Sequence, residues 1–387
     1  MNWKNCLARQ RKEDKYDDKF GFVGMKDMTY VMLKDVCTIK MGQSPNSNSY
    51  NDNGDGIPFF QGNADFGERY PVTRKWCSAP TKMAAPEDIL ISVRAPIGAM
   101  NYAKEDCCIG RGLAALTPNK SKVSPEFIFW VLKSKNVELN SKGTGSTFKA
   151  IGRKVLEETL VPDIPLEKQI EFSEILDRVY GVIQARKEEL QKLNDLVKAR
   201  FVEMFGMLGA DDFGWGLAPL GSICSINPKK GQDLRLSGGV EVSFVPMLAV
   251  TEHGEIDATA IKEYDEVKTG FTYFAENDVL FAKITPCMEN GKGAVARGLH
   301  NGLGFGSTEF HVLRPISGKS NPYWIYTLTT FSQFREDAAS NMTGSAGQRR
   351  VPASFLEKYC VAVPPIELQD QFADFVKQVD KSKFVYY

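Results

Sequence analysis

The longest regular pattern of apolar positions runs from residue 162 to residue 205. Apolar residues recur there at alternating steps of four and three, the a/d spacing of a heptad repeat, and only two arginines interrupt it. The seam positions are Phe172, Leu176, Val179, Ile183, Arg186, Leu190, Leu193, Val197, Arg200 and Met204. A proline at 165 suits the first turn of a helix, and glycines at 206 and 209 suit its end. The pattern predicts a helix of about 40 residues, roughly 60 Å long, whose apolar seam needs a partner.

An internal repeat supplies a candidate partner for this helix. Six landmarks occur in the same order in two copies, which argues against chance. The pairs are 33–42 with 220–229, 86–94 with 275–283, 108–116 with 304–313, 124–132 with 321–328, 143–151 with 342–351, and 161–169 with 361–369. The seam recurs as well, at Phe372, Val376 and Val379. The alternative is one long core helix of a single domain, although globular helices average about 11–12 residues.

Each copy of the repeat has the same predicted plan. Short strands with β-branched or alternating residues, such as 88–93, 242–250 and 278–284, are separated by Gly, Asn and Pro turns. A helix follows, opened by Ser124-Pro125 in the first copy and Asn321-Pro322 in the second, an N-cap followed by proline. A Gly/Ser/Thr loop, a short strand and the heptad helix complete the copy. The fold class is therefore α/β (α+β), with two similar mixed α/β domains.

Composition narrows the class of protein without deciding it. The chain has 48 basic and 48 acidic residues, so there is no global basic signature of nucleic-acid binding, although a local patch suffices. No run of 18 apolar residues predicts a membrane span, and the charged N-terminus lacks the apolar centre of a signal peptide. Residues 1–28 are expected to form a peripheral extension. The eight cysteines form no C-x-x-C pair, as expected for reduced thiols in the cytoplasm.

Signals for catalysis or a metal site are weak. All three histidines, His253, His300 and His311, fall in the second copy, whereas a duplicated active site needs one in each. The glycine-rich stretch 143–154 lacks the spacing of a phosphate-binding loop. The sequence Asn-Pro-Tyr-Trp at 321–324 is similar to the base-holding Asn-Pro-Pro-Tyr loop of amino-methyltransferases, but it lacks one proline. Helix capping explains this sequence and its counterpart in the first copy, so we expect no catalytic residue and no metal ligand.

The loops of both copies share a bias toward residues that contact nucleic acid. The repeated Thr-Gly-Ser loop is followed by basic residues in each copy, and Lys and Arg suit phosphate oxygens. Nearby turns carry Gln, Asn and Arg, the types that read base edges. The alternative for any one of them is an ordinary solvated loop residue. The predicted DNA-binding residues are Gln43, Gln61, Asn63, Arg94, Arg111, Thr144, Lys149, Arg153, Lys229, Lys230, Lys283, Lys292, Gln348, Arg349 and Arg350.

These residues and motifs resemble the specificity (S) subunit of type I restriction-modification enzymes. The resemblance covers roughly residues 29–387. It is carried by the Leu-x-x-[Val/Ile]-Cys-x-Ile opening of each copy, the Asp-Ile-Leu and Asp-Val-Leu strands, the Thr-Gly-Ser loops and the helix starts Pro-Leu-Glu-Lys-Gln and Pro-Ile-Glu-Leu-Gln. No single motif is specific, but their two-fold arrangement is.

The resemblance implies an architecture and a role. Target-recognition domains at 29–160 and 215–362 would each read one half of a split site on double-stranded DNA. Spacer helices at 161–208 and 363–387, the second one shortened, would pack as a long antiparallel coiled coil that sets the gap between the half-sites. The chain itself would bind no cofactor. Two modification subunits would carry S-adenosylmethionine and methylate adenine, and restriction subunits would use ATP and Mg²⁺ to translocate and cut DNA.

Two other functions remain open from the residues alone. A stand-alone DNA adenine methyltransferase or a nuclease would need a cofactor loop or a carboxylate cluster, and neither is seen in the sequence. A purely structural interaction protein would use the heptad helix and need no DNA contact. Replacing the basic loop residues with alanine tests this last hypothesis. If the chain is a purely structural interaction protein, the replacement leaves DNA affinity unchanged.

Overall fold

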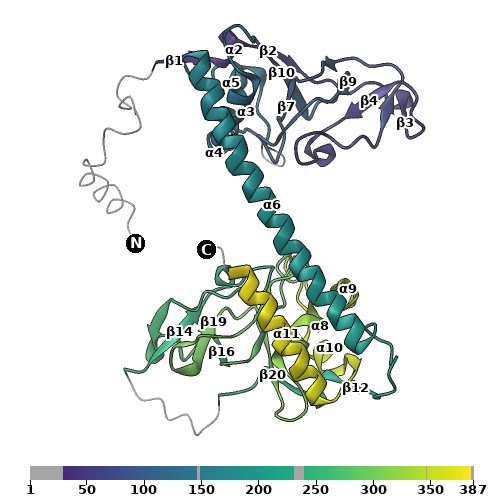
Figure 1. Ribbon diagram of the computed structural model, residues 1–387, viewed down its shortest axis with the longest axis vertical. Coiled ribbons are helices and arrows are strands. Elements are labelled where there is room, and N and C mark those ends of the chain that lie inside the picture. The colour runs from purple at the N-terminus through teal and green to yellow at the C-terminus, as the bar shows by residue number, and fades with distance from the viewer. Residues whose placement is uncertain (1–28, 146–148, 231–238, 346, 385–387) are drawn as a thin grey trace. The chain divides into compact units, whose positions relative to one another are not determined.

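The computed structural model describes residues 29–145, 149–230, 239–345 and 347–384, so the predicted extension at 1–28 lies outside the described residues. The chain divides into two compact units, unit 1 (Met1–Ile183) and unit 2 (Gln184–Tyr387). Each unit combines β-sheets with helices (Figure 1). No described helix is long and apolar enough to cross a lipid bilayer.

Unit 1 is built around a four-stranded antiparallel sheet. Its strand order is β2 (Cys37–Met41), β10 (Leu113–Pro118), β7 (Ile89–Ser92) and β8 (Met100–Tyr102). A second sheet has the order β3 (Tyr50–Asn51), β5 (Trp76–Cys77), β4 (Ile57–Phe60), β9 (Cys107–Ile109) and β6 (Met83–Ala84). A short pair joins β1 (Tyr30–Met32) to β11 (Leu160–Pro162). Every residue of β7 is buried, which matches its uninterrupted run of Ile, Leu and Ile.

Helices cover the first sheet of unit 1. The helix α3 (Pro125–Ser134) begins as predicted, with the Ser124 hydroxyl accepting a hydrogen bond from the Phe127 N–H and a proline in the first turn. Ile128 and Leu132 of α3 are fully buried in one core with Ile89 and Leu116. The remaining helices of the unit, apart from the long α6 below, are α2 (Leu33–Val36), α4 (Asn136–Ser141) and α5 (Arg153–Glu157).

Unit 2 repeats this framework. Its first sheet has the order β13 (Cys224–Ile226), β20 (Phe310–Pro315), β17 (Val279–Ala282) and β18 (Gly293–Val295), and β12 (Leu217–Pro219) pairs with β21 (Cys360–Ala362). The second sheet has the order β15 (Ile261–Glu263), β14 (Glu241–Val245), β19 (Leu303–Gly306) and β16 (Thr272–Ala275). The helices are α7 (Tyr264–Val267), α8 (Pro322–Thr329), α9 (Ser332–Ser340) and α10 (Ala353–Lys358).

The prediction of two similar mixed α/β domains is confirmed strand by strand. The strands β2, β10, β7 and β8 correspond to β13, β20, β17 and β18, and the terminal pair β1–β11 corresponds to β12–β21. Both second sheets contain one parallel pair, β4–β9 in unit 1 and β14–β19 in unit 2. The second sheets otherwise differ, since unit 1 has five strands and unit 2 has four. The two copies therefore share a frame and diverge in the sheet attached to it.

The heptad pattern forms one helix, α6, over Leu166–Phe205, a length of 40 residues. It ends before Gly206, whose positive φ of 79° suits glycine. In unit 2 its last turns lie antiparallel to α11 (Ile366–Phe384), as Figure 1 shows. The Phe201 and Phe205 ring centroids lie 5.6 and 5.4 Å from that of Phe372. Further back along α6, an Nη of Arg186 donates to the Lys383 carbonyl at 2.7 Å.

Burial along the seam differs sharply between the two units. In unit 2 the seam residues Val197, Phe372, Val376 and Val379 are all buried, and Leu193 is half-buried. Phe201 and Phe205, which lie off the predicted seam, are buried with them. A straight helix drifts about 20° per heptad relative to a 3.5-residue repeat, which carries the apolar face onto these phenylalanines.

In unit 1 the seam residues of α6 are exposed. Phe172, Leu176, Val179 and Ile183 are 42–51% exposed, and Leu190, just inside unit 2, is half-buried. The coiled-coil role of this half of the seam stays a prediction.

Candidate nucleic-acid interface

In unit 1 the structure joins the Thr-Gly-Ser loop to the loop that follows β7. The Ala95 N–H donates to the Lys149 carbonyl at 3.0 Å, and the Ile151 N–H donates to the Val93 carbonyl at 2.9 Å. The loop is closed at its base by two backbone hydrogen bonds between Thr144 and Ala150. The Arg94 and Lys149 side chains, both predicted to bind DNA, are exposed on these adjoining loops.

Unit 2 contains the same junction. The Thr285 N–H donates to the Arg349 carbonyl at 3.0 Å, the Val351 N–H donates to the Lys283 carbonyl at 2.9 Å, and two backbone bonds join Thr343 to Arg350. A cis proline follows the strand in both copies, at Pro96 and Pro286. Lys149 and Arg349 are therefore structurally equivalent, exposed cations that the two frames hold in the same place.

Three further predicted residues lie on neighbouring loops of unit 1. Backbone hydrogen bonds link the Gln43 N–H to the Ile109 carbonyl at 3.0 Å and the Gly112 N–H to the Gln61 carbonyl at 3.2 Å. The Val93 N–H in turn donates to the Gly112 carbonyl at 2.9 Å, which connects these loops to the junction. These connected loops carry the exposed side chains of Gln43, Gln61, Arg111, Arg94 and Lys149. Asn63 begins the 3-10 turn Asn63–Asp65 and is half-buried.

Other predicted DNA-binding side chains have partners within the protein. Arg153 pairs with Glu157 at 2.7 Å in an exposed i,i+4 bridge. The Lys230 ammonium lies 4.0 Å from the ring centroid of Tyr264, and Lys292 donates to the Met247 carbonyl at 3.3 Å. Arg350 forms a two-pronged ion pair with Glu309. Lys229 and Gln348 are exposed and Lys283 is half-buried. DNA contact by these side chains stays a prediction.

A buried glutamine that the sequence argument overlooked repeats in both units. In unit 1 the Gln169 Oε1 accepts from the Ser124 N–H at 2.9 Å, and its Nε2 donates to the Ile164 carbonyl at 2.8 Å. In unit 2 the Gln369 Oε1 accepts from the Asn321 N–H at 2.9 Å, and its Nε2 donates to the Pro364 carbonyl at 2.9 Å. Each glutamine thus ties the first turn of a spacer helix to the N-cap of a domain helix. The repeated Pro-x-Glu-x-Gln start was the signal that could have revealed it.

Replacing this glutamine is expected to destabilise the unit that contains it. Gln369→Ala leaves the Asn321 N–H and the carbonyls of Lys319 and Pro364 without their partner in a site where Gln369 is 0% exposed. Such a loss costs about 1–3 kcal/mol. Urea unfolding followed by hydrogen exchange of unit 2 peptides measures it. Gln371→Ala is the matched control, because Gln371 is exposed on the same helix, and an equal effect of both variants would contradict the role of the buried amide.

The structure brings no catalytic set together in the described part of the chain. His311 is buried between Asn227 and the Val351 carbonyl, and His300 lies 3.3 Å from Glu241 on the surface. Asn321 caps α8, with its Oδ1 accepting from the Tyr323 N–H at 2.9 Å, and Trp324 is 1% exposed. The Asn-Pro-Tyr-Trp sequence is thus a helix cap, and its indole is out of reach of a flipped base.

Two buried thiols stay protonated, and the described acidic residues form no metal-binding group. Burial raises the pKa of the Cys37 and Cys224 thiols to about 12, which keeps both protonated at neutral pH. Among the residues that the structure describes, no group of three or more His, Cys, Asp and Glu side chains is arranged to hold a metal ion.

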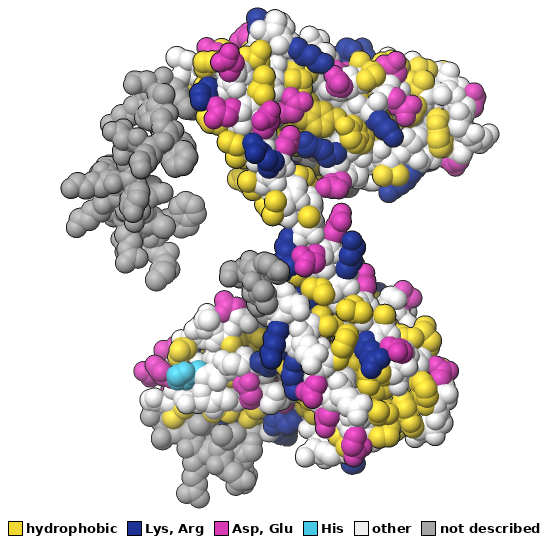
Figure 2. Space-filling model, in the orientation of Figure 1, with side chains coloured by type: hydrophobic (Ala, Val, Ile, Leu, Met, Phe, Trp, Pro, Cys, Tyr) yellow, Lys and Arg dark blue, Asp and Glu magenta, His cyan; other side chains and the backbone are white. Residues whose placement is uncertain are grey.

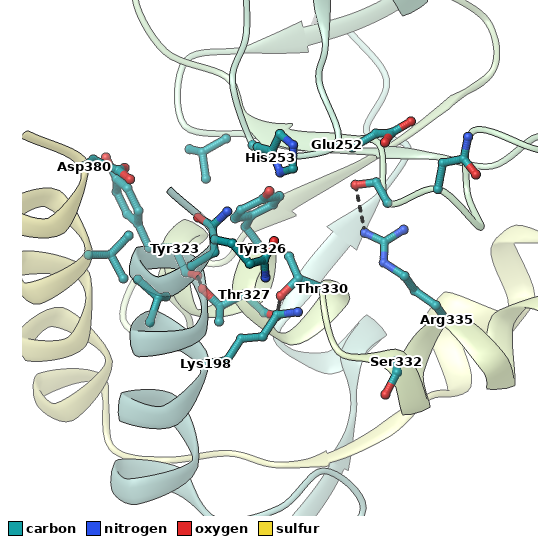
Figure 3. A pocket seen from close by; sticks show the side chains of 18 of the residues that line it. Lys198, Glu252, His253, Tyr323, Tyr326, Thr327, Thr330, Ser332, Arg335 and Asp380 are labelled. Carbon is teal, nitrogen blue, oxygen red and sulfur yellow. Dashed lines mark hydrogen bonds between the residues drawn. The ribbon is translucent and has the colours of Figure 1, made fainter. Parts of the chain in front are cut away.

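Unit 2 contains a cavity of about 480 Å³ between α6, α8, α11 and the turns at 252–254 and 289–291 (Figure 3). Four basic and four acidic side chains line it, so it does not favour a ligand of either charge. Arg335 is held there by the carbonyls of Met288 and Gly291, and burial lowers its pKa. Figure 2 likewise shows basic and acidic side chains interspersed over both units on the face drawn.

Two copies of one mixed α/β frame, each with an exposed loop junction and a proline-started helix, define an internally duplicated protein. The family model for the type I restriction modification DNA specificity domain matches twice, over residues 25–195 and 214–384. The chain therefore belongs to this family.

Relatives in this family match parts of the chain. The putative type I restriction enzyme MjaX specificity subunit of Methanocaldococcus jannaschii is 42% identical over 160 residues, 41% of this chain and 38% of its own length. The type I restriction enzyme EcoEI specificity subunit of Escherichia coli is 38% identical over 214 residues, 53% of this chain and 34% of its own length. The chain thus spans between a third and two fifths of the length of these relatives.

Among solved structures, the HsdS subunit from Thermoanaerobacter tengcongensis is 43% identical over 43% of this chain and 41% of its own, with a TM-score of 0.38.

Proposed function

We propose that this chain is the sequence-specific DNA-binding subunit of a type I restriction-modification complex. Each unit reads one half of a bipartite site on double-stranded DNA, and partner subunits carry out adenine methylation and restriction. The observation that carries the proposal is the equivalence of Lys149 and Arg349, two exposed cations held by the same backbone hydrogen bonds in both units.

The repeat suggests how the contacts divide between affinity and specificity. A contact that recurs at the same place in both units cannot distinguish the two half-sites, so Lys149 and Arg349 suit phosphate oxygens. The second sheets and their loops differ between the units and suit base readout. In unit 1 the exposed edge formed by Gln43, Gln61 and Arg111 carries side chains able to contact base edges.

The proposed role assigns the chemistry to other subunits. Two modification subunits bind S-adenosylmethionine and methylate adenine, and restriction subunits hydrolyse ATP with Mg²⁺, translocate and cut. This chain supplies recognition and, through α6 and α11, the spacing between the half-sites. The complex acts on cellular DNA in the cytoplasm. A stand-alone methyltransferase is not favoured, since Trp324 is buried and Asn321 is a helix cap.

A footprint of the reconstituted complex tests the proposal. Single-molecule sequencing of methylated adenines in the host, with and without this gene, first identifies the site. The complex of this chain with its modification subunits is then expected to protect two short patches separated by unread bases, because two units on a spacer read two segments. One continuous protected segment would contradict the bipartite reading. Methyl transfer by the isolated chain would instead favour the methyltransferase alternative.

A further inference from the structure

Glu309 forms an ion pair with Arg350, the residue that follows Arg349 in the second Thr-Gly-Ser loop. The Arg350 Nε donates to the Glu309 Oε2 at 2.9 Å, and its Nη2 donates to the Oε1 at 2.8 Å, a two-pronged pairing. The remaining nitrogen, Nη1, donates to the Gln348 carbonyl at 3.0 Å. All three nitrogens of the guanidinium thus donate within unit 2, and the Arg350 hydrogen bond lowers the pKa of Glu309, which keeps the carboxylate charged.

The backbone around this ion pair brings three segments together. The Lys283 N–H donates to the Glu309 carbonyl at 2.9 Å, and the Val351 N–H donates to the Lys283 carbonyl at 2.9 Å. His311, in β20 two residues beyond Glu309, has its Nε2 2.8 Å from the Val351 carbonyl. Glu309 and His311 therefore secure the side chain of Arg350 and the backbone of the next residue, which fixes the end of the loop that carries Gln348 and Arg349.

Unit 1 has the same backbone bonds without this clamp. The Val93 N–H donates to the Gly112 carbonyl at 2.9 Å, as Lys283 does to Glu309. The strand registers make Gly112, Ala114 and Ala150 the counterparts of Glu309, His311 and Arg350. The clamp is thus a feature of unit 2 alone, and the shared frame does not require it.

A carboxylate at a DNA-binding junction needs a reason, because it repels phosphate. The Glu309 side chain is 25% exposed and that of Arg350 is 41% exposed, so both lie at the surface of the junction. The pair is neutral as a whole and contributes no net attraction for DNA. Its geometric effect is to fix the loop residue next to Arg349.

We infer that Glu309 is a positioning residue that acts through Arg350 to orient Gln348 and Arg349 toward the half-site read by unit 2. The inference rests on the proposed function and revises the role of Arg350, from a direct phosphate ligand to an internal anchor. In the opposite assignment, Arg350 leaves Glu309 to bind phosphate. Removal of the Glu309 charge then strengthens DNA binding, whereas under the positioning role it weakens DNA binding.

Glu309→Gln separates the two assignments. The amide keeps the shape of the side chain and removes one negative charge. If Glu309 merely competes with phosphate for Arg350, the variant binds DNA more tightly. If Glu309 positions the loop, the variant binds about 5- to 20-fold more weakly, which corresponds to about 1–1.8 kcal/mol.

The experiment uses the full chain reconstituted with its modification subunits and compares Glu309→Gln, Arg350→Gln and the double variant. Affinity is measured on the intact site and on sites with one mismatched base pair in either half. We expect all three variants to bind equally weakly, because the two residues act as a unit. We also expect reduced discrimination in the half-site read by unit 2, unchanged discrimination in the other half, and an unchanged melting temperature.

Three results would overturn the inference. Tighter or unchanged binding by Glu309→Gln would remove the positioning role while leaving the proposed function intact. Additive losses in the double variant would show that Arg350 contacts DNA independently of Glu309. Absence of sequence-dependent binding by the wild-type complex would overturn the proposed function and this inference with it.

Discussion

Phe372→Ala is expected to destabilise unit 2 by about 3–5 kcal/mol, the usual range for truncating a buried aromatic side chain. Phe372 is 0% exposed, and its ring lies against Phe201 and Phe205 of α6 at centroid distances of 5.6 and 5.4 Å. Its removal opens a cavity where α11 meets α6. Urea unfolding monitored by hydrogen exchange of unit 2 peptides measures the loss, and the peptides of α11 should lose protection first.

The repeat provides the matched control for this variant. Phe172 occupies the corresponding position at the start of α6 but is 45% exposed, so Phe172→Ala should cost less than about 1 kcal/mol. Equal destabilisation by the two variants would show that α6 is covered at Phe172 in solution as α11 is at Phe372. That outcome would contradict the difference in burial between the two halves of the seam.

The double variant Lys149→Ala and Arg349→Ala is expected to weaken DNA binding by the reconstituted complex at least about 100-fold. Each charge-assisted hydrogen bond contributes about 1.5–3 kcal/mol, and every 1.4 kcal/mol corresponds to a factor of ten. If both side chains contact phosphates, the slope of log affinity against log salt concentration falls by about 0.9 for each. Titrations from low to high salt measure the affinity and the slope together.

Lys104→Ala is a suitable control for the loss of a positive charge, since Lys104 is exposed on the bend between β8 and β9 and belongs to neither junction loop. It should leave the affinity and the salt slope close to those of the wild type. The double variant is expected to lose DNA affinity to the same extent on matched and mismatched sites, because phosphate contacts carry no sequence information. An unchanged salt slope would favour a purely structural interaction protein.

Local signals predicted the elements of the fold well. Ser124-Pro125 and Asn321-Pro322 predicted helix starts that the structure shows at α3 and α8. The heptad spacing after Pro165 predicted the 40-residue helix α6. These signals succeed because capping and periodicity depend on residues within a turn or two along the chain.

Contacts between distant segments were beyond such signals. Glu309 and Arg350 are separated by 41 positions, so the sequence offered Arg350 as a free cation and did not reveal its partner. Gln369 and Asn321 are 48 positions apart, and the role of the repeated glutamine became visible only when its amide was seen to bridge two elements. Phe201 and Phe205 were missed because helix drift, which depends on what the helix packs against, moved the buried face off the heptad seam.

The sequence by itself determined the duplicated frame, the start and end of the long helix, and the loops whose basic residues make DNA binding the expected function. Those properties follow from the order and spacing of residues along the chain. Only the tertiary structure decided that Lys149 and Arg349 occupy equivalent places, that Arg350 is held by Glu309, and that Phe372 is buried while Phe172 is exposed. Burial and pairing depend on which neighbours the fold brings alongside a side chain, and identical repeat positions can therefore acquire different roles.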